Sequence, residues 1–453
     1  MVHQFTIRDV HMVLDVNSGA VHVLDEKASR VLACYNSSGQ PETEKLDALK
    51  QQYGTEAIGE ICSELDALIA EGLLFSGDPY EALFSHRDSP TVIKALCLHI
   101  AHDCNLKCKY CFAGEGNYHG EKTQMSLEVG QGAIDFVIEN SGSRKNIEID
   151  FFGGEPLLNL DTIKGIVNYA REREKTCGKH FRFTLTTNGV LLKDEEMEYL
   201  NSAMDNIVLS LDGRKDVHDH MRARKDGSGT YDAVVPKFQN MAAKRGDKDY
   251  YVRGTYTANN LDFSKDVLHM AELGFDQLSV EPVVLPDGSG FEIRKEHLPA
   301  LFREYEKLAE ELLRLRREGR KVNFFHFMID LEGGPCVAKR LRGCGSGTEY
   351  LAVTPQGDLY PCHQFAGISD FRLGDIYSGI NRPDITDAFR RINVYTKKAC
   401  RECWARFYCS GGCAANAWNF QKDLAGVYEI GCELQKKRVE CALWLKAMER
   451  DEE

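Results

Sequence analysis

The sequence has no apolar run long enough to cross a membrane, which excludes a transmembrane protein. Its N-terminus, MVHQFTIRDV, lacks the basic region and the apolar core of a secretory signal. Internal repeats and low-complexity tracts are also absent. The composition, with 43% hydrophobic and 28% charged residues, is typical of a globular protein. We therefore expect a cytoplasmic protein without a membrane partner.

An excess of basic residues is missing as well. The formal net charge is -13, from 56 Lys and Arg against 69 Asp and Glu. Because phosphate binding depends on clustered Lys and Arg, this balance argues against a nucleic-acid partner. At 453 residues the chain exceeds the size of one ordinary core, so we expect two or three domains.

The 16 cysteines are unevenly distributed. Cytoplasmic thiols are kept reduced, so metal binding explains so many of them better than disulfides do. Five stand alone in apolar or helical surroundings and are expected to be small buried side chains: Cys34, Cys62, Cys97, Cys177 and Cys441. The other eleven fall in two places, at residues 104–111 and at residues 336–432.

The two ends of the chain differ in pattern. Residues 1–90 predict a hairpin at 11–25 followed by three helices, the outline of a winged helix. Residues 323–453 have weak strand and helix signals but dense Cys and Gly. Such a segment rarely buries enough apolar surface alone, so we expect metal sites to hold it together.

Residues 91–322 alternate strands with helices. The expected strands are 92–100, 147–152, 181–187, 206–212, 250–257 and 275–283. Six such units predict an α/β fold with a parallel sheet, either doubly wound or an incomplete barrel. Ligands of these folds bind at the carboxyl ends of the strands. The first group of cysteines directly follows the first of these strands.

Cys104, Cys108 and Cys111 form a C-x3-C-x2-C loop with no fourth thiol nearby. Structural zinc sites and ordinary iron-sulfur sites take four protein ligands. Three thiolates can cap three irons of a [4Fe-4S] cube, which leaves the fourth iron open for another ligand. Zinc is the alternative, although its closely spaced ligands usually come in C-x2-4-C pairs.

This loop, with Tyr110 before its last cysteine, resembles the signature of the radical S-adenosylmethionine (SAM) enzymes. The resemblance implies that the open iron chelates the amino and carboxylate groups of SAM. Reduction of the cluster then releases a 5'-deoxyadenosyl radical. The elements FFGGEP, TTNG, LSLDG and HDHMR resemble further positions of that family at successive strand ends. The residues implied to contact SAM are Tyr110, Gly153, Gly154, Glu155, Asn188, Ser210 and Arg222.

The resemblance implies a different role for each kind of residue. Gly153 and Gly154 let the backbone approach the ligand. Glu155 accepts a hydrogen bond from the SAM ammonium group, and Arg222 presents its fork to the SAM carboxylate. Taken singly, GGEP is equally a turn and Arg222 equally a surface charge. Their order at the ends of successive strands makes the combined signal specific.

The C-terminal cysteines resemble the SPASM domain of radical SAM peptide maturases. The matching residues are Cys344, Cys362, Cys400, Cys403, Cys409, Cys413 and Cys432. The resemblance implies two auxiliary [4Fe-4S] clusters, and hence three clusters in all. In the family's pairing, Cys400, Cys403, Cys409 and Cys432 hold one cluster, and the remaining three hold the other. Zinc is again the alternative for residues 400–413.

Seven thiols are one short of two complete clusters. Cys336 resembles an extra ligand of some relatives, although Gly333, Gly334 and Pro335 leave the path of its loop open. If Cys336 does not bind, one auxiliary cluster keeps an open iron. That iron would hold a substrate cysteine as its thiolate, because a bound metal lowers the thiol pKa.

Residues 1–90 carry six Lys or Arg against fifteen Asp or Glu, a local charge of 6 - 15 = -9 that repels DNA. The segment instead resembles the peptide-recognition element of ribosomal-peptide maturation enzymes. That resemblance implies an exposed strand edge, around Val21 to Leu24, which accepts the substrate's leader as an added strand beside the helix at 55–73. An inert accessory domain is the alternative.

The order of the three segments resembles the thioether-forming maturases, and CKYCFAGEG is most similar to the SCIFF (six cysteines in forty-five residues) maturases. The expected fold is a partial (β/α)6 barrel at residues 91–322, with a peptide-recognition domain at 1–90 and a SPASM domain at 323–453. The expected enzyme is a radical SAM oxidoreductase that joins a cysteine sulfur to a carbon of a Cys-rich precursor peptide. Flavodoxin or ferredoxin is expected to supply low-potential electrons.

Two other functions stay open. A sulfatase-type maturase oxidises Ser or Cys to formylglycine, and that family carries an Asp after the cysteine equivalent to Cys362. This chain has His363 there, for which a surface histidine is the plainer interpretation. A non-catalytic iron-sulfur electron carrier is the second alternative.

Overall fold

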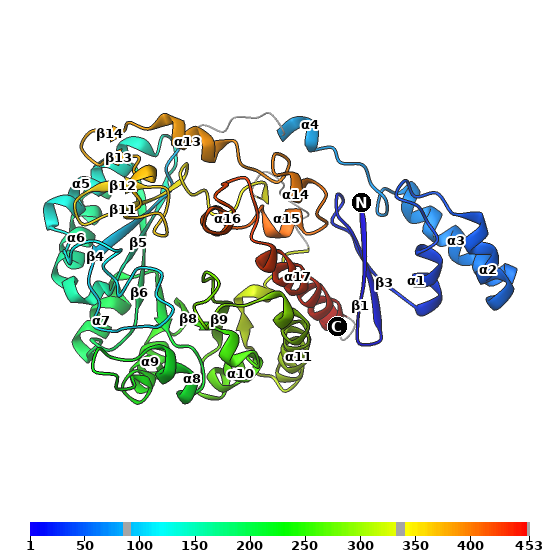
Figure 1. The fold of residues 1–453 in the computed structure, drawn as a ribbon, viewed down its shortest axis with the longest axis horizontal. Coiled ribbons are helices and arrows are strands. Elements are labelled where there is room, and N and C mark those ends of the chain that lie inside the picture. Colours follow the sequence, from blue (N-terminus) through cyan, green and yellow to red (C-terminus); the bar gives the residue numbers. More distant parts are fainter. Residues whose placement is uncertain (85–91, 332–339, 451–453) are drawn as a thin grey trace.

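The computed structural model describes residues 1–84, 92–331 and 340–450. Their strands form two sheets, one of three strands and one of eleven. The larger sheet curves around the body of the molecule, and the smaller one lies beside the long C-terminal helix (Figure 1). In the described part of the chain, no helix is long and apolar enough to cross a membrane.

The N-terminal unit begins with a three-stranded antiparallel sheet in the order β1-β2-β3. Its strands are β1 (Val2–Ile7), β2 (Val10–Asp15) and β3 (Val21–Leu24). Its helices are α1 (Glu26–Leu32), α2 (Thr43–Tyr53), α3 (Thr55–Ala70) and the short α4 (Glu81–Phe84). The hairpin and the three helices agree with the sequence pattern, whereas β1 was not predicted. Strand β3 pairs only with β2, so the expected edge around Val21 is an edge strand.

The two faces of this small sheet are buried against different partners, because successive side chains of a strand point to opposite sides. Val13 packs into a separate core with Val31 and Ile58 of the helices. Met12 and Leu14, on either side of Val13, belong to the main core of the molecule. The N-terminal unit therefore has its own core and is also packed onto the body.

The barrel strands are parallel and follow their sequence order, as the alternating pattern predicts. They are β4 (Ala95–Ala101), β5 (Asn146–Gly153), β6 (His180–Thr187), β7 (Asn206–Ser210), β8 (Asp249–Tyr256), β9 (Gln277–Pro282) and the short β10 (Asn323–Phe324). The helices are α5 (Leu127–Asn140), α6 (Leu160–Cys177), α7 (Asp194–Ala203), α8 (Lys215–Met221), α9 (Tyr231–Arg245), α10 (Ser264–Glu272) and α11 (Leu298–Arg317). The two-residue β10 adds a seventh parallel strand to the expected six.

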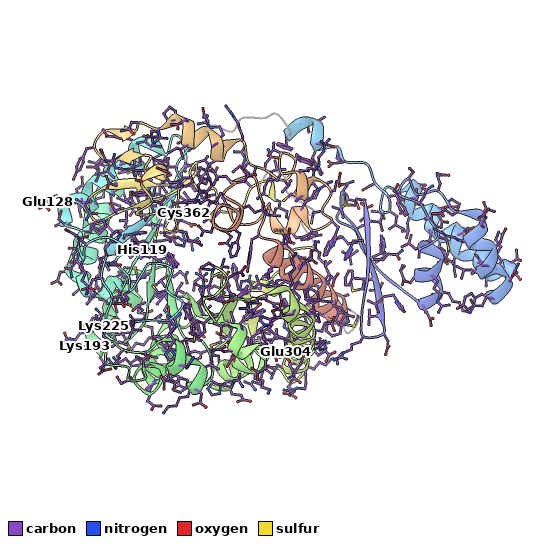
Figure 2. The ribbon with its side chains drawn as sticks, in the orientation of Figure 1. His119, Glu128, Lys193, Lys225, Glu304 and Cys362 are labelled. Atoms are coloured by element: carbon purple, nitrogen blue, oxygen red, sulfur yellow. The ribbon has the colours of Figure 1, made fainter. Side chains whose placement is uncertain are left out.

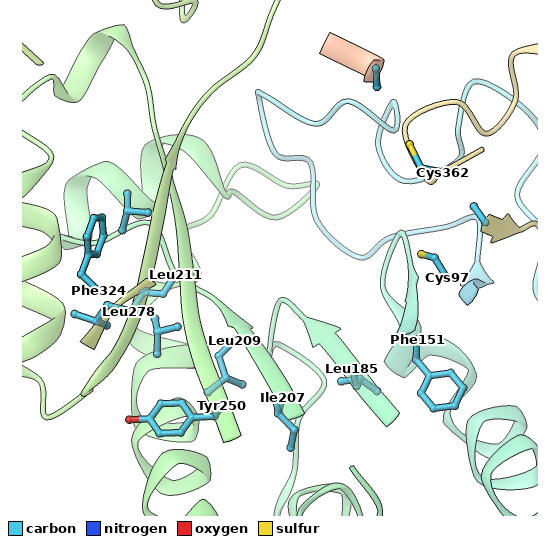
Figure 3. Close-up of a cluster of buried hydrophobic side chains, with 14 of the residues drawn as sticks. Cys97, Phe151, Leu185, Ile207, Leu209, Leu211, Tyr250, Leu278, Phe324 and Cys362 are labelled. Carbon is cyan, nitrogen blue, oxygen red and sulfur yellow. The ribbon is translucent and has the colours of Figure 1, made fainter. Parts of the chain in front are cut away.

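The sheet separates an apolar outer face from a polar inner face. Phe151, Leu185, Ile207 and Leu209 are fully or almost fully buried along neighbouring strands (Figure 3). Alternate positions such as Thr186 and Ser210 line a cavity on the other face. The apolar side chains thus fix the sheet against its helices, while the inner face keeps polar groups for a ligand.

The C-terminal segment continues the same sheet, a contribution to its stability that its weak strand signals did not predict. Strand β11 (Tyr350–Val353) pairs in parallel with β4, and β12 (Asp358–Tyr360), β13 (Gly374–Asp375) and β14 (Gly379–Ile380) follow as antiparallel strands. The helices are α13 (Pro383–Arg390), α14 (Lys398–Arg401), α15 (Arg406–Cys409), α16 (Ala414–Gln421) and α17 (Glu429–Arg450). Hydrogen bonds therefore run across the expected boundary at residue 322.

A buried ion pair joins the N-terminal unit to the C-terminal segment. The Arg406 guanidinium donates to Asp78 at 2.8 Å and to the side chain of Asn17 at 2.7 Å. Tyr395 also donates to Asp78, at 3.1 Å. Nearby, the His3 ring stacks on Trp404 with centroids 3.7 Å apart.

Replacing Arg406 with Met should weaken this junction. Removal of one partner from a buried ion pair leaves the other charge uncompensated, which costs about 3–5 kcal/mol. We expect faster hydrogen exchange in β1 and β2, measured by mass spectrometry. Arg382→Met is the matched control, because its pair with Asp384 is exposed, and a pair of that kind contributes about 0–1 kcal/mol. Equal exchange in both variants would contradict the prediction.

Candidate active site

One cavity of about 1280 Å³ lies on the inner face of the barrel, at the carboxyl ends of β5 to β9. Its wall is completed by the loop after β4 and by the C-terminal segment. Nine of the ten predicted ligand cysteines line it: Cys104, Cys108, Cys111, Cys344, Cys400, Cys403, Cys409, Cys413 and Cys432. Cys362, the tenth, is buried, and Figure 2 shows it in the interior while Glu128 and Lys193 lie at the outer edge.

The cysteine loop is held against the sheet by backbone contacts. Gly154 donates its N–H to Ala101 at 2.8 Å, and Glu155 donates its N–H to Asp103 at 2.9 Å. A Cβ atom at Gly154 would overlap the carbonyl group of Asp103, and one at Gly153, where φ is +117°, would overlap that of Ala101. These glycines were predicted to let the backbone approach a ligand. In the structure, the atoms nearest to them belong to β4 and the cysteine loop.

Two of the three loop thiols are strongly affected by burial. Burial, together with the nearby Glu155 carboxylate, raises the pKa of Cys104 to about 12. Burial also raises the pKa of Cys108 to about 11, against the opposing effect of Arg222. Loss of the proton from these thiols therefore needs a positively charged partner, and iron is such a partner when it binds sulfur. The donor set fits an iron-sulfur cluster, although among the residues described no three His, Cys, Asp or Glu side chains converge on a single-ion position.

Glu155 links the ends of two neighbouring strands. One carboxylate oxygen accepts the Leu157 N–H at 3.1 Å and the Thr187 hydroxyl at 2.7 Å, and the other accepts the Asn188 N–H at 2.8 Å. Burial raises its pKa to about 7 despite these bonds. The oxygen bonded to Asn188 has a lone pair left to accept a hydrogen bond from the SAM ammonium group, the donor predicted from the sequence.

Asn188 connects this junction to the cysteine loop. Its side-chain amide donates to Asn105 at 2.8 Å and lies 3.7 Å from the Cys104 sulfur. Tyr110, Ser210 and Arg222, the other residues predicted to contact SAM, also line the cavity. The structure thus brings all seven of these residues to one wall.

Asp212, which was not predicted from the sequence, is fully buried and bonds to two of these residues. Tyr110 donates its hydroxyl to Asp212 at 2.6 Å, and Arg222 donates its Nε–H at 3.0 Å. The available signal was the segment LSLDG, in which Asp212 comes two positions after Ser210.

The C-terminal thiols form two neighbouring groups. Burial, together with Cys400 and Cys403, raises the pKa of Cys409 to about 11. Burial, together with Cys409 and Cys403, also raises the pKa of Cys432 to about 11. These four thiols therefore lie close enough to interact.

The second group contains three thiols. Burial raises the pKa of Cys362 to about 12, and Cys413 and Cys344 contribute in the same direction. The two groups coincide with the pairing that the resemblance implies, while their binding of iron remains a prediction. Cys336 lies outside the described residues.

His363 is half-buried in the cavity wall, so the expectation of a surface histidine was wrong. Its ring lies 5.5 Å from that of Phe112 and 5.2 Å from that of Phe152. Burial, assisted by Arg253, lowers its pKa to about 4. The side chain is therefore neutral near pH 7.

Residues 98–252 match the family model described as the Radical SAM superfamily. The matched residues of this chain are similar to that family. Over 369 residues the chain is 26% identical to an uncharacterized protein of Archaeoglobus fulgidus, covering 79% of this chain and 81% of the relative. It is 24% identical over 351 residues to the serine-type anaerobic sulfatase-maturating enzyme of Bacteroides thetaiotaomicron, covering 71% and 82%. It is 24% identical over 342 residues to the antilisterial bacteriocin subtilosin biosynthesis protein AlbA of Bacillus subtilis, covering 71% and 67%.

Two solved structures share the fold of most of this chain. Native anSMEcpe with bound AdoMet has a TM-score of 0.64 at 20% identity and covers 78% of this chain and 98% of its own. Streptococcus suis SuiB bound to precursor peptide SuiA has a TM-score of 0.54 at 16% identity and covers 94% of this chain and 97% of its own. The part of this chain outside the SuiB match is smaller than residues 1–90, so most of the N-terminal unit has a structural counterpart there.

Replacing Gly154 with Ala should displace the cysteine loop, because the added methyl group would occupy the space of the Asp103 carbonyl. After anaerobic reconstitution we expect the variant to bind about one cluster's iron less than the parent, as three-cysteine sites lose affinity when one ligand moves. Iron and sulfide assays measure this. Gly59→Ala is the control, since its Cβ meets no atom within 4 Å. Full iron content in Gly154→Ala would contradict the prediction.

Proposed function

We propose that this chain is a radical SAM maturase that forms Cys sulfur-to-carbon thioether crosslinks in a ribosomally made, Cys-rich peptide of the SCIFF type. The observation that carries the proposal is that a single cavity is lined by the cysteine loop and by both C-terminal thiol groups. A peptide in this cavity would meet the proposed SAM site and the auxiliary site together. The proposed enzyme is an oxidoreductase.

The proposed cofactors are SAM and three [4Fe-4S] clusters, which when bound would supply a 5'-deoxyadenosyl radical and an acceptor for one electron. Cys104, Cys108 and Cys111 would hold the SAM-cleaving cluster. Glu155 and Arg222 would bind the charged ends of the SAM methionine moiety, because one has a free carboxylate lone pair and the other a free guanidinium fork. Flavodoxin or ferredoxin is the proposed electron donor.

The substrate side of the proposal rests on the thiol group of Cys344, Cys362 and Cys413. Three protein thiols leave one iron position for a substrate cysteine, which would lose its proton on binding. The neutral imidazole of His363, the residue after Cys362, lines the cavity. The sulfur that forms the crosslink would thus be held as a thiolate close to the carbon radical.

The peptide leader is proposed to bind along strand β3. This strand has one unpaired edge in the described sheet, and an extended peptide can add to such an edge through backbone hydrogen bonds. The fold of SuiB, which was solved with a precursor peptide, matches most of the N-terminal unit. The coverage supports a peptide-binding role without identifying the peptide.

A formylglycine-forming maturase is the second candidate. The similarity to the serine-type anaerobic sulfatase-maturating enzyme over 71% of this chain favours it. His363, half-buried in the cavity wall, would then take the position that an Asp base has in that family. The products distinguish the two candidates, because a thioether joins two residues of the peptide and formylglycine modifies one.

Anaerobic incubation of the reconstituted protein with SAM, reductant and a Cys-rich peptide encoded nearby should yield 5'-deoxyadenosine and a peptide lighter by two hydrogen atoms per crosslink. Tandem mass spectrometry locates the linkage, and the variant with Cys104, Cys108 and Cys111 all changed to Ala is the control. Production of formylglycine would favour the second candidate. Absence of 5'-deoxyadenosine would favour a non-catalytic electron carrier.

Replacing the exposed Val23 of β3 with Asp should weaken leader binding while the reaction cavity stays intact. Its side chain is 48% exposed, so the fold should tolerate the change. Loss of a hot-spot contact costs more than about 1 kcal/mol, and about 1.4 kcal/mol corresponds to tenfold in affinity, so we expect KM for the peptide to rise about 10-fold with kcat unchanged. Leu83→Asp, at a residue 63% exposed on α4, is the matched control. An equal rise in both variants would argue against binding at β3.

A further inference from the structure

Asp212 joins three separate segments of the cavity wall. It follows strand β7 and has no exposed side-chain area. Its carboxylate accepts the Tyr110 hydroxyl at 2.6 Å, the Arg222 Nε–H at 3.0 Å and the Thr255 backbone N–H at 3.0 Å. These donors come from the cysteine loop, from the end of α8 and from β8. A single carboxylate therefore fixes the cysteine loop relative to two strand ends.

The bond to Asp212 also determines which part of Arg222 faces the cavity. Nε is occupied, and the guanidinium carbon lies 5.5 Å from the centre of the Tyr110 ring. Across the described chain, neither terminal nitrogen of Arg222 has a hydrogen-bond partner, and the residue lines the cavity. Two anchors thus fix the guanidinium plane and leave its two-pronged end for a carboxylate.

A ring of hydrogen bonds holds the backbone around this pair. The Asp212 N–H donates to His218 Nδ1 at 3.3 Å, and His218 Nε2 lies 2.9 Å from the Thr230 hydroxyl. That hydroxyl donates to the backbone carbonyl of Arg222 at 2.8 Å. The ring returns to its start through the Arg222–Asp212 side-chain contact. Both ends of Arg222, backbone and guanidinium, are therefore fixed to the same residue.

We propose that Asp212 is the positioning residue that sets the separation and orientation between the cysteine loop and the carboxylate-binding fork of Arg222. The inference rests on the proposed function, because the carboxylate in question is that of SAM. SAM would have to reach the open iron with its amino and carboxylate groups while its carboxylate meets Arg222. Asp212 bonds both to Tyr110 of the cysteine loop and to Arg222, so it connects the iron-binding loop to the residue that would bind the SAM carboxylate.

The test is the affinity of the iron-loaded, full-length protein for SAM. Asp212→Asn keeps the shape of the side chain and removes its charge, so the Arg222 and Tyr110 contacts weaken together. Loss of a supporting partner of this kind typically costs about 10- to 100-fold in affinity. We expect that loss in equilibrium binding of SAM, with iron and sulfide content unchanged. The change that SAM produces in the electron paramagnetic resonance spectrum of the reduced cluster should shrink in parallel.

Tyr110→Phe tests one of the two Asp212 contacts alone. It removes the hydroxyl that donates to Asp212 and leaves the Arg222 bond in place. We expect about 2- to 10-fold weaker SAM binding, the loss typical of one hydrogen bond. The variant that combines Tyr110→Phe with Asp212→Asn should bind SAM no more weakly than Asp212→Asn alone, since both changes affect the same network. If the losses in SAM affinity of the two single variants add in the combined variant, the proposal is overturned.

Asp266→Asn is the matched control. Asp266 is also fully buried and also accepts an arginine Nε–H, from Arg214 at 2.8 Å, but Arg214, unlike Arg222, does not line the cavity. We expect this variant to melt at a lower temperature and to bind SAM like the parent. Equal loss of SAM affinity in both Asp variants would make Asp212 a general stabilising residue and overturn the proposal.

The outcomes separate this inference from the proposed function. If the parent binds SAM and Asp212→Asn binds it equally well, the positioning role is overturned and the proposed function stands. If the iron-loaded parent binds no SAM, the proposed function fails and the inference fails with it. If Asp212→Asn does not fold, Tyr110→Phe decides, and unchanged affinity in that variant overturns the proposal.

Discussion

The site depends on the close approach of the cysteine loop to the end of strand β5. Gly154 and Glu155 bond to the backbone of Ala101 and Asp103, and the space between the two segments excludes even a methyl group at Gly154. This contact places the thiols directly above the carboxyl ends of the strands, where Asn188, Ser210 and Arg222 also line the cavity. A looser contact would leave the same residues present but too far apart to act on one ligand.

The environment of the thiols explains why the protein alone keeps them protonated. Burial raises the pKa of both Cys104 and Cys108 well above the ordinary thiol value, and the only opposing side chain near Cys108 among the groups that shift its pKa is Arg222. Removing a proton from such a site requires a cation bound to sulfur. Deprotonation and iron binding would therefore occur together, and the same holds for Cys409 and Cys362 in the C-terminal groups.

The sequence predicted those parts of the fold and site that local pattern determines. Alternating apolar residues identified the barrel strands, and the spacing of Cys104, Cys108 and Cys111 identified the loop. Features that depend on contacts between distant segments were not predictable in this way. Pairing of β11 with β4 joins residues about 255 positions apart, and His363 is half-buried beside the Phe112 and Phe152 rings. Asp212 was overlooked because its importance comes from its bonds to Tyr110 and Arg222, which only the folded structure shows.

The N-terminal unit contacts the C-terminal segment next to the thiols of one group. Arg406, which bonds to Asp78 and Asn17, begins helix α15, and that helix ends at Cys409. Trp404, which stacks on His3 of strand β1, directly follows Cys403. The residues that contact the N-terminal unit therefore belong to the same short segment as three of the four thiols in one group. Through Arg406 and Trp404, the small sheet is joined directly to the segment that carries these thiols.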